Sequence, residues 1–274
     1  MPPVVEAAPA KLNLALHVTG RRADGYHLLD SLVAFAGVGD VVTLEPGPLS
    51  LRIDGPFAAG LSTDDNLCLR AARLAGADAA ITLTKTLPVA SGIGGGSADA
   101  AAVLRGLVQM GHALPLQAER LGADVPVCLA SGPARMQGVG EVVTPLPPLP
   151  PIPLVLVNPG IALSTPQVFA AMDRRDNPGL PAIPRFAGLA DLTAWLAGTR
   201  NDLEPAALSI APAVGQVLDA LRTTGAAFAR MSGSGATCFG FYDSPDRARI
   251  AATALKRHGW WAVATELAPP LAAR

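Results

Sequence analysis

Cysteine is scarce in this chain of 274 residues, and its three cysteines lie far apart. Cys68, Cys128 and Cys238 are odd in number and share no paired spacing. The sequence therefore contains neither a disulfide framework nor a paired zinc-ligand motif. We expect all three to be buried, reduced thiols.

An excess of charge of either sign is also missing. The chain has 21 Lys and Arg against 22 Asp and Glu, which gives a net charge of −1. Such a balance creates no overall field that favours nucleic acid or an anionic membrane, so any anion must be held by local groups. We expect no nucleic-acid partner and no membrane partner.

Long hydrophobic runs are lacking as well. No run of about 18 uninterrupted apolar residues occurs, and residues 1–9 show no basic region followed by an apolar stretch. These absences predict a cytoplasmic enzyme. What the chain does contain is 50% hydrophobic and 16% charged residues, a composition that excludes a disordered polyelectrolyte and is typical of a well-buried globular protein.

Proline is concentrated in residues 145–153. Proline removes backbone donors and holds the chain near an extended form, which suits a stiff connector. A proline-rich ligand for a partner is the alternative, but the apolar, strand-like residues 154–157 follow at once and favour the connector. We therefore predict two domains, residues 1–150 and residues 151–274.

The first segment with chemical interest is residues 10–18, which alternate strictly between two kinds of side chain. Alternation predicts a half-buried strand. One face carries Leu12, Leu14, Leu16 and Val18, and the other carries Lys11, Asn13, Ala15 and His17. Lys11 and Asn13 are candidates for the edge of a site, although a solvated strand face explains the pattern equally simply.

The strongest local signal is the glycine-rich stretch at residues 88–98, here called the phosphate loop. It follows strand-like residues 80–84 and leads into a helix-forming stretch. Glycines let the backbone approach an anion closely, and the helix that follows contributes its positive N-terminal end. The order of strand, loop and helix favours phosphate binding over a simple flexible turn.

This stretch is neither of the two common nucleotide-binding motifs. No lysine follows Gly96, as a P-loop requires, and Ser97 stands where the Rossmann fingerprint needs its third glycine. The charge of a bound phosphate must then be compensated by a metal or by a distant basic residue such as Lys85 or Lys11.

Three shorter segments are ambiguous when each is taken alone. Asp24-Gly25 predicts a tight turn that presents Tyr26 and His27 for stacking on a flat base, or else an ordinary surface hairpin. Asp124, among small and apolar neighbours, is either a tuned base or a helix cap. Residues 230–240 form a second Gly/Ser loop or a bulged hairpin, and lack the Gly-x-Ser-x-Gly frame of a serine hydrolase.

Taken together, these segments resemble the GHMP kinases, named for galactokinase, homoserine kinase, mevalonate kinase and phosphomevalonate kinase. The similarity is carried by residues 9–14, 88–98 and 232–236. Residues 24–27, 121–126 and 201–204 are further similar to the members that phosphorylate a cytidyl-methylerythritol substrate. The resemblance extends from Ala8 to about Tyr242.

The resemblance implies a two-domain α+β GHMP kinase fold with the active site between the domains. The N-terminal domain, which binds ATP, would be ribosomal protein S5 domain 2-like, and the C-terminal domain ferredoxin-like. The implied reaction is ATP-dependent phosphorylation of the 2-hydroxyl of the cytidyl-methylerythritol substrate, giving the 2-phosphate and ADP in non-mevalonate (MEP) isoprenoid synthesis. Mg²⁺ is expected with ATP, and the protein is expected to be a monomer or weak homodimer.

Two other functions stay open at this point. A GHMP kinase of the mevalonate or homoserine type would share the loops but ignore the cytidyl group. A non-catalytic nucleotide-binding regulator would be favoured if Lys11 or Asp124 were replaced, but both are present.

The resemblance also implies roles for individual residues and names no metal ligand. The catalytic pair is Lys11 and Asp124. The ATP-binding residues are Pro88, Val89, Ala90, Ser91, Gly92, Ile93, Gly94, Gly95, Gly96, Ser97 and Ala98. The substrate-binding residues are Asn13, Tyr26, His27, Thr165 and Phe169, and Gly233, Ser234 and Gly235 close around the phosphates. The segment at residues 111–120 is shorter than is usual in the family, which makes the placement of Asp124 a question for the structure.

Overall fold

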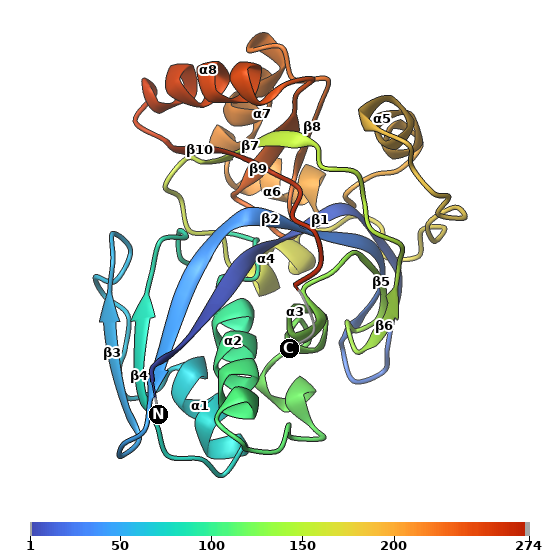
Figure 1. The fold of residues 1–274 in the computed structure, drawn as a ribbon. Helices are drawn as coiled ribbons and strands as arrows, with labels where there is room; N and C mark the ends of the chain where they lie inside the picture. Colours follow the sequence, from blue (N-terminus) through green and yellow to red (C-terminus); the bar gives the residue numbers. More distant parts are fainter. Residues whose placement is uncertain (1, 272–274) are drawn as a thin grey trace.

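The computed structural model describes residues 2–271, and within this range two β-sheets are stacked (Figure 1). The first sheet contains β1 (Val4–Arg21), β2 (His27–Glu45), β3 (Ser50–Asp54), β4 (Ala80–Thr84), β5 (Ala134–Gly138) and β6 (Val142–Pro145). The second contains β7 (Pro153–Asn158), β8 (Phe228–Met231), β9 (Cys238–Phe241) and β10 (Trp261–Glu266).

Most helices lie against the outer faces of the two sheets, whereas the helix at residues 189–197 lies to one side and packs against the apolar cluster between the sheets (Figure 1). Those of the first half of the chain are α1 (Leu67–Leu74), α2 (Gly95–Gln109), the 3-10 turn η1 (Ala118–Leu121) and α3 (Val125–Ala130). Those of the second half are α4 (Thr165–Ala170), α5 (Leu189–Ala197), α6 (Glu204–Ile210), α7 (Ala213–Thr223) and α8 (Pro245–Lys256).

The long strand β2 organises the first sheet. Its antiparallel partner β1 runs beside it from Val4 to Arg21, while β5 and β4 pair with residues 29–33 and 41–45 of β2. The strand β3 adds parallel to β4 and β6 adds antiparallel to β5. β1 and β2 are long and pair along almost their whole length. Residues near the middle of β1 therefore pack against the second sheet as well as within the first.

The expectation of a half-buried β1 is wrong, because β1 is buried on both faces. Lys11, Asn13 and His17 are at most 4% exposed. The alternation is also interrupted by a shift in register between Asn13 and Ala15. A β-bulge turns the following side chains over, so Leu12 and Leu14 pack in one apolar cluster and Leu16 and Val18 in another.

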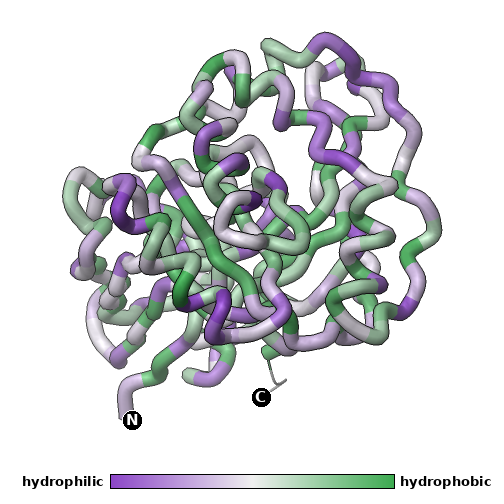
Figure 2. The backbone as a smooth tube through the Cα atoms, turned by 90° about the horizontal axis from the view of Figure 1, so that it is seen from above, coloured by the Kyte–Doolittle hydropathy of each residue, from purple (hydrophilic) through white to green (hydrophobic). Residues whose placement is uncertain are grey.

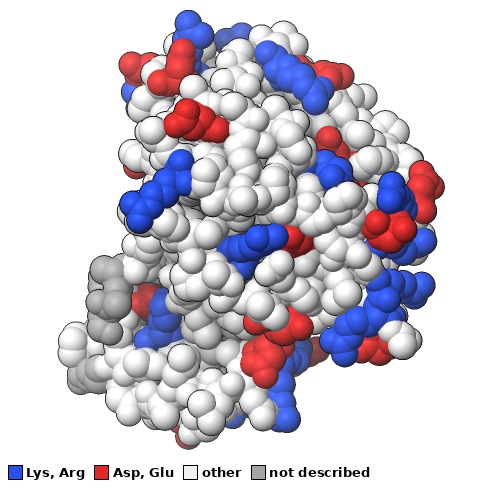
Figure 3. Space-filling model, turned by 90° about the vertical axis from the view of Figure 1, so that its right-hand side faces the viewer, with Lys and Arg blue, Asp and Glu red and all other residues white. Residues whose placement is uncertain are grey.

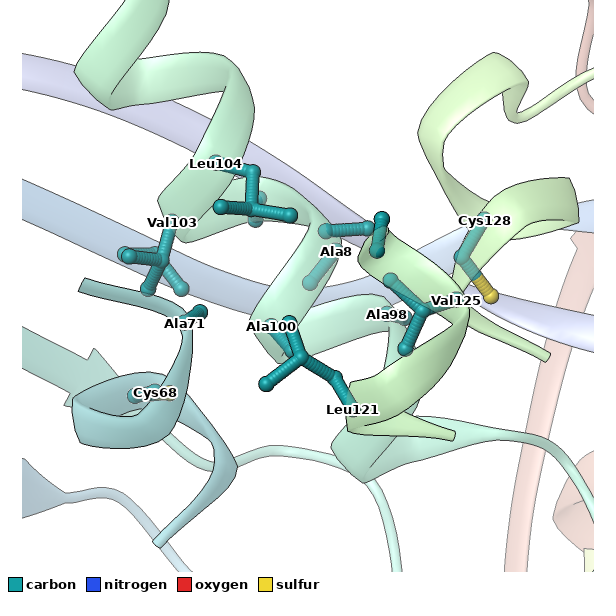
Figure 4. Close-up of a cluster of buried hydrophobic side chains, with 14 of the residues drawn as sticks. Ala8, Cys68, Ala71, Ala98, Ala100, Val103, Leu104, Leu121, Val125 and Cys128 are labelled. Atoms are coloured by element: carbon teal, nitrogen blue, oxygen red, sulfur yellow. The ribbon is translucent and has the colours of Figure 1, made fainter. Parts of the chain in front are cut away.

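The outer face of the first sheet is covered by α1, α2 and α3, which pack around a core rich in small residues (Figure 4). The side of α2 that faces inward carries Ala98, Ala100, Val103 and Leu104, all at most 1% exposed. Alanines leave room for close approach of the helix to β1 and β2, so the alanine enrichment of the sequence has a packing role. The phosphate loop is thereby mounted on a rigid helix.

The second sheet has the strand order β10-β7-β9-β8 and is antiparallel throughout. With α7 before β8 and α8 before β10, its sequence of elements is the β-α-β-β-α-β unit of ferredoxin-like folds. The predicted ferredoxin-like C-terminal fold is confirmed.

A third apolar cluster fills the space between the two sheets. It includes Leu12 and Leu14 of β1 together with Leu154, Leu156 and Phe239 of the second sheet. The chain crosses from one sheet to the other through residues 146–152, which have no regular secondary structure. In the hydropathy view a long green stretch accordingly crosses the middle of the molecule (Figure 2).

The three cysteines agree with expectation. All three thiols are free and buried. On the face shown in Figure 3 basic and acidic side chains are interleaved and form no patch of one sign. Among the described residues, no helix has the length and apolar character that crossing a bilayer requires.

His17 shows that a buried polar residue of β1 can be purely structural. Its Nε2 accepts a hydrogen bond from the N–H of Arg200 at 3.1 Å, so its Nδ1 carries the proton donated to the carbonyl of Pro178 at 3.0 Å. The ring must therefore be neutral. Burial, followed by the charge of Arg200, lowers its pKa below the ordinary value of 6.5.

This geometry predicts that the free energy of unfolding decreases as the pH is lowered. Since the folded pKa of His17 lies below 6.5, the unfolded chain binds the proton more readily, and stability is lost as the pH falls below 6.5. Tm measured by calorimetry from pH 7.5 to pH 5 should fall further for the native protein than for His17→Gln. The other histidines are common to both proteins, so equal slopes would show that His17 makes no contribution.

Candidate active site

An open cleft of about 780 Å³ lies where β1, the phosphate loop and the second half of the chain meet. Most predicted site residues line it. They are Lys11, Asn13, Pro88, Val89, Ala90, Ser91, Gly92, Gly94, Gly95, Gly96, Ser97, Asp124, Thr165, Phe169, Gly233 and Ser234. Ile93 and Ala98 are instead buried in the core, and Tyr26, His27 and Gly235 lie outside the lining.

The hydroxyl of Ser232 joins three segments that are distant in sequence. It accepts a hydrogen bond from the N–H of Asn13 at 3.1 Å and donates one to the carbonyl of Gly92 at 3.0 Å. A backbone bond of 2.9 Å from Lys11 to Ile93 adds to this contact. Because Ser232 is fully buried and both of its bonds are internal, it is not available as a nucleophile, and the hydrolase alternative is excluded.

Besides the Ser232 hydroxyl, the backbone of the phosphate loop lies directly against the backbone of the Gly/Ser loop, defined as residues 232–236. At Gly92, φ is +75° and an added Cβ would stand 2.5 Å from the carbonyl oxygen of Ser232. At Gly94, φ is +64°, and this left-handed residue begins α2 without a side-chain cap. The first N–H groups of α2 therefore have no intrahelical or side-chain partner and present a positive helix end to the cleft.

Lys11 and Asp124 form an ion pair at the edge of the cleft. Their Nζ and Oδ2 atoms are 2.8 Å apart, with the lysine 5% and the aspartate 30% exposed. Asp124 stands just before α3, but its side chain makes no capping bond to that helix. The shorter segment at residues 111–120 therefore leaves the carboxylate in reach of Lys11.

The amide of Asn13 has a defined orientation. The hydroxyl of Ser31 donates its proton to the carbonyl of Ala15 at 2.7 Å, so it can only accept from Asn13, which donates through Nδ2 at 2.8 Å. The Oδ1 of Asn13 is then left buried with no partner among the described residues. A buried acceptor without a donor is costly, and a hydroxyl donor entering from the cleft would satisfy this oxygen.

Lys85 is held by two buried carboxylates that the sequence pattern did not single out. Its Nζ contacts Asp40 and, at 2.8 Å, Oδ2 of Asp99. Burial raises the pKa of Asp99 to about 7 against the lowering effect of Lys85. Both lysines line the cleft and are almost equally buried, but Lys85 is paired with two carboxylates and Lys11 with one, so Lys11 has more positive charge to offer a bound phosphate.

The predicted base-binding aromatics come together only in part. Gly25 has φ of +92°, as the predicted tight turn requires. His27 stacks on Phe169, with ring centroids 4.6 Å apart. Tyr26 is 65% exposed at the hairpin. Burial, with Arg21 and Arg175, lowers the pKa of His27, so this ring is neutral near pH 7.

An apolar part of the cleft escaped sequence reasoning. Its walls include Leu61, Leu67 and Leu83 beside the start of α2. Leu67 lies so close that an added Cβ on Gly96 would be 3.3 Å from its Cδ1. These leucines come from three separate segments without a shared motif, and only the packing of α1 against α2 assembles them.

The glycine-rich loop, the Lys–Asp pair and the two stacked sheets together define a GHMP kinase. Residues 66–132 match the family described as GHMP kinases N terminal domain, and residues 180–259 match GHMP kinases C terminal. A protein of Paracoccus denitrificans named 4-diphosphocytidyl-2-C-methyl-D-erythritol kinase is 62% identical over 96% of this chain and 97% of its own length. The chain belongs to the 4-diphosphocytidyl-2-C-methyl-D-erythritol kinase family.

Further comparisons agree. The protein of that name from Ruegeria pomeroyi is 56% identical over 93% of this chain and 95% of its own length. A crystal structure of 4-(cytidine 5'-diphospho)-2C-methyl-D-erythritol kinase superimposes with a TM-score of 0.77 and 37% identity, covering 96% of this chain and 98% of that chain. Homoserine kinase from Cytophaga hutchinsonii, 18% identical with a TM-score of 0.66 over 98% of this chain and 96% of its own, shares the fold.

The close contact at Gly92 yields a prediction. Gly92→Ala should weaken ATP binding at least tenfold, because the new Cβ forces the phosphate loop away from the Gly/Ser loop. Calorimetric titration with ATP measures the change. The matched control is Gly225→Ala, since Gly225 also has positive φ but nothing within 4 Å of an added Cβ. The free energy of unfolding of both variants should fall by about 1–2 kcal/mol, because alanine is strained at a positive φ. Equal ATP affinity in the two would contradict the contact's role.

Proposed function

We propose that the chain transfers the γ-phosphoryl group of ATP to the 2-hydroxyl of 4-diphosphocytidyl-2-C-methyl-D-erythritol, giving the 2-phosphate and ADP in the MEP route. The observation that carries this proposal is the Lys11–Asp124 pair, 2.8 Å apart in the same cleft as the phosphate loop. The names of the close relatives supply the substrate.

The first requirement of phosphoryl transfer is to hold and neutralise the phosphates. The free N–H groups at the start of α2 bind the phosphates of ATP, and Gly233 and Ser234 close on them from the opposite side. Leu61, Leu67 and Leu83 offer an apolar surface for the adenine ring. ATP then lies along the loop with its γ-phosphoryl group toward Lys11.

The second requirement is to deprotonate the hydroxyl as it attacks. A bond forms between the 2-oxygen and the γ-phosphorus while the bond from phosphorus to the leaving oxygen of ADP breaks, and Asp124 accepts the proton. Lys11, 2.8 Å from the carboxylate of Asp124, offsets the negative charge that gathers at the nucleophile. The unpaired Oδ1 of Asn13 accepts a hydrogen bond from the methylerythritol part and orients it.

The cytidine end is assigned to Tyr26, His27 and Phe169, with Thr165 on the same helix as Phe169. The His27–Phe169 stack supplies an aromatic surface, and Nε2 of His27 is buried with no partner among the described residues. A neutral imidazole nitrogen can exchange a hydrogen bond with the edge of a cytosine ring. Tyr26, exposed beside it, is free to close over the base.

Mg²⁺ fits this cleft in the way usual for phosphoryl transfer. Among the described residues no cluster of three or more His, Cys, Asp or Glu forms a metal cage, and Mg²⁺ commonly binds substrate phosphates with one or two protein oxygens. The hydroxyl of Ser97, which lines the cleft at the start of α2, is an oxygen ligand of this kind. The ion would supply charge neutralisation on the β- and γ-phosphates.

Two features of organisation belong to the same proposal. The division into an ATP-binding domain of residues 1–150 and a C-terminal domain of residues 151–274 is supported by the two sheets, which end at Pro145 and begin at Pro153. Since the cleft collects its residues from one chain, a monomer or weak homodimer is sufficient for activity.

A substrate panel tests the function. With Mg-ATP, the cytidyl-methylerythritol substrate should be phosphorylated with kcat/KM at least 10³-fold above mevalonate or homoserine, because binding of the cytidyl group adds stacking and hydrogen bonds worth several kcal/mol. A preference for mevalonate or homoserine would reassign the chain to another GHMP kinase. Binding of ATP without transfer to any of the three would favour the regulator.

The role of Asp124 gives a separate prediction. Asp124→Asn keeps the shape of the side chain but cannot accept the proton, so kcat should fall by roughly 10²–10⁴ with ATP affinity largely kept. Single-turnover transfer and calorimetric titration measure the two effects. The matched control is Asp176→Asn at an 82% exposed side chain, which should behave as the native protein. Near-normal transfer in Asp124→Asn would make Asp124 structural.

A further inference from the structure

The segment at residues 201–204, Asn-Asp-Leu-Glu, has no role in the mechanism above, yet Asn201 and Leu203 are buried and Asp202 and Glu204 are half-buried. Asn201 is 4% exposed and Leu203 is 1% exposed. Asn201 and Glu204 are polar residues that lie outside the cleft lining. A buried polar group persists where its hydrogen bonds specify one arrangement of its partners.

Asn201 uses its whole amide on backbone groups. Its Nδ2 donates to the carbonyls of Met231 at 2.9 Å and Gly233 at 2.8 Å, and its Oδ1 accepts from the N–H of Leu203 at 3.0 Å. Both Nδ2 acceptors are carbonyl oxygens, so only an amide in this orientation fits. Asn201 therefore fixes the backbone at Met231, just before the Gly/Ser loop, and at Gly233 within it.

Glu204, the first residue of α6, binds the same backbone segment. Its Oε2 accepts from the N–H of Met231 at 2.9 Å, so the N–H and the carbonyl of Met231 are both bound by the 201–204 segment. At Gly233, where φ is +54°, the peptide plane is fixed by its carbonyl. The N–H of Ser234 belongs to the same plane and points to the side opposite Asn201.

The same segment is attached to the strand that carries the catalytic lysine. The N–H of Leu16 donates to the carbonyl of Arg200 at 2.9 Å, the N–H of Asp202 donates to Leu16 at 2.8 Å, and the N–H of Val18 donates to Oδ2 of Asp202 at 2.7 Å. Residues 200–202 thus extend the sheet beside β1. The segment links β1 to the Gly/Ser loop on its other side.

We propose that Asn201 and Glu204 are positioning residues for phosphoryl transfer. They set the Gly/Ser loop against β1, so that Gly233 and Ser234 meet the phosphates at the distance where Lys11 and Asp124 meet the hydroxyl. This inference rests on the proposed function for the identity of the reaction. Asn201 and Glu204 fix the backbone of the loop on the side away from the cleft and do not contact the substrate.

The test compares two kinds of change at each position. Asn201→Asp is nearly isosteric but cannot donate to two carbonyls, and Glu204→Ala removes the acceptor for Met231. Glu204→Gln keeps an acceptor oxygen and serves as the conservative rescue. Asn177→Asp is the matched control, because Asn177 also donates to Val18 of β1 but makes no contact with the Gly/Ser loop.

Single-turnover transfer at saturating Mg-ATP and cytidyl substrate is measured together with the cytidyl-substrate Kd and Tm. We expect Asn201→Asp and Glu204→Ala to slow transfer by 10-fold to roughly 100-fold, since a misplacement near 1 Å can cost about 10² in rate. The substrate Kd should change much less than the rate, because the His27–Phe169 stack is not part of the loop and the loop touches the cytidine site through the Thr165–Ser234 hydrogen bond of 2.7 Å. Glu204→Gln and Asn177→Asp should transfer at the native rate.

Transfer at the native rate per folded molecule in both Asn201→Asp and Glu204→Ala would overturn the proposal. If Asn201→Asp fails to fold, Glu204→Ala against Glu204→Gln decides, and equal slowing in that pair would also overturn it. Failure of the proposed function shows itself differently. The native protein would then ignore the cytidyl substrate, and the same variants would be measured with the alcohol that the native protein does phosphorylate.

Discussion

The active site depends on one buried hydroxyl. Ser232 accepts from the N–H of Asn13 and donates to the carbonyl of Gly92, which binds β1, the phosphate loop and the Gly/Ser loop at one point. Lys11, two residues before Asn13, then lies beside the phosphate loop, and its partner Asp124 follows. Removing such a hydroxyl leaves a buried donor and acceptor unpaired, at about 1–3 kcal/mol each.

The rest of the fold makes this junction possible. Because β1 lies between α2 on one side and the second sheet on the other, its middle is buried on both faces, and polar side chains such as Asn13 and His17 persist there only with internal partners. The second sheet brings the Gly/Ser loop to β1, and the alanine-rich face of α2 brings the phosphate loop. Phosphoryl transfer needs such rigid placement more than it needs covalent chemistry from the protein.

Much of this could be predicted from sequence, since strand 80–84, the phosphate loop with its helix and the turn at Gly25 follow local patterns, and the resemblance to the GHMP kinases implied the fold. The bulge after Asn13 could not, because a register shift depends on the partner strand and leaves strict alternation in the sequence. Asp40 and Asp99 were missed since their pairing with Lys85 joins distant segments. In the sequence Ser232 is only one residue of a Gly/Ser loop that lacks the serine hydrolase frame, and its burial and hydrogen bonds reveal that it joins the loops.

The most direct test of the account is the position of the acceptor hydroxyl in a complex with a non-hydrolysable ATP analogue, Mg²⁺ and the cytidyl substrate. The account predicts the 2-oxygen at about 2.6–3.2 Å from the carboxylate of Asp124. The γ-phosphorus should lie between the start of α2 and Lys11. The attacking 2-oxygen, the γ-phosphorus and the leaving oxygen of ADP should lie on one line. A 2-oxygen nearer to another acceptor, with Asp124 paired only to Lys11, would contradict it.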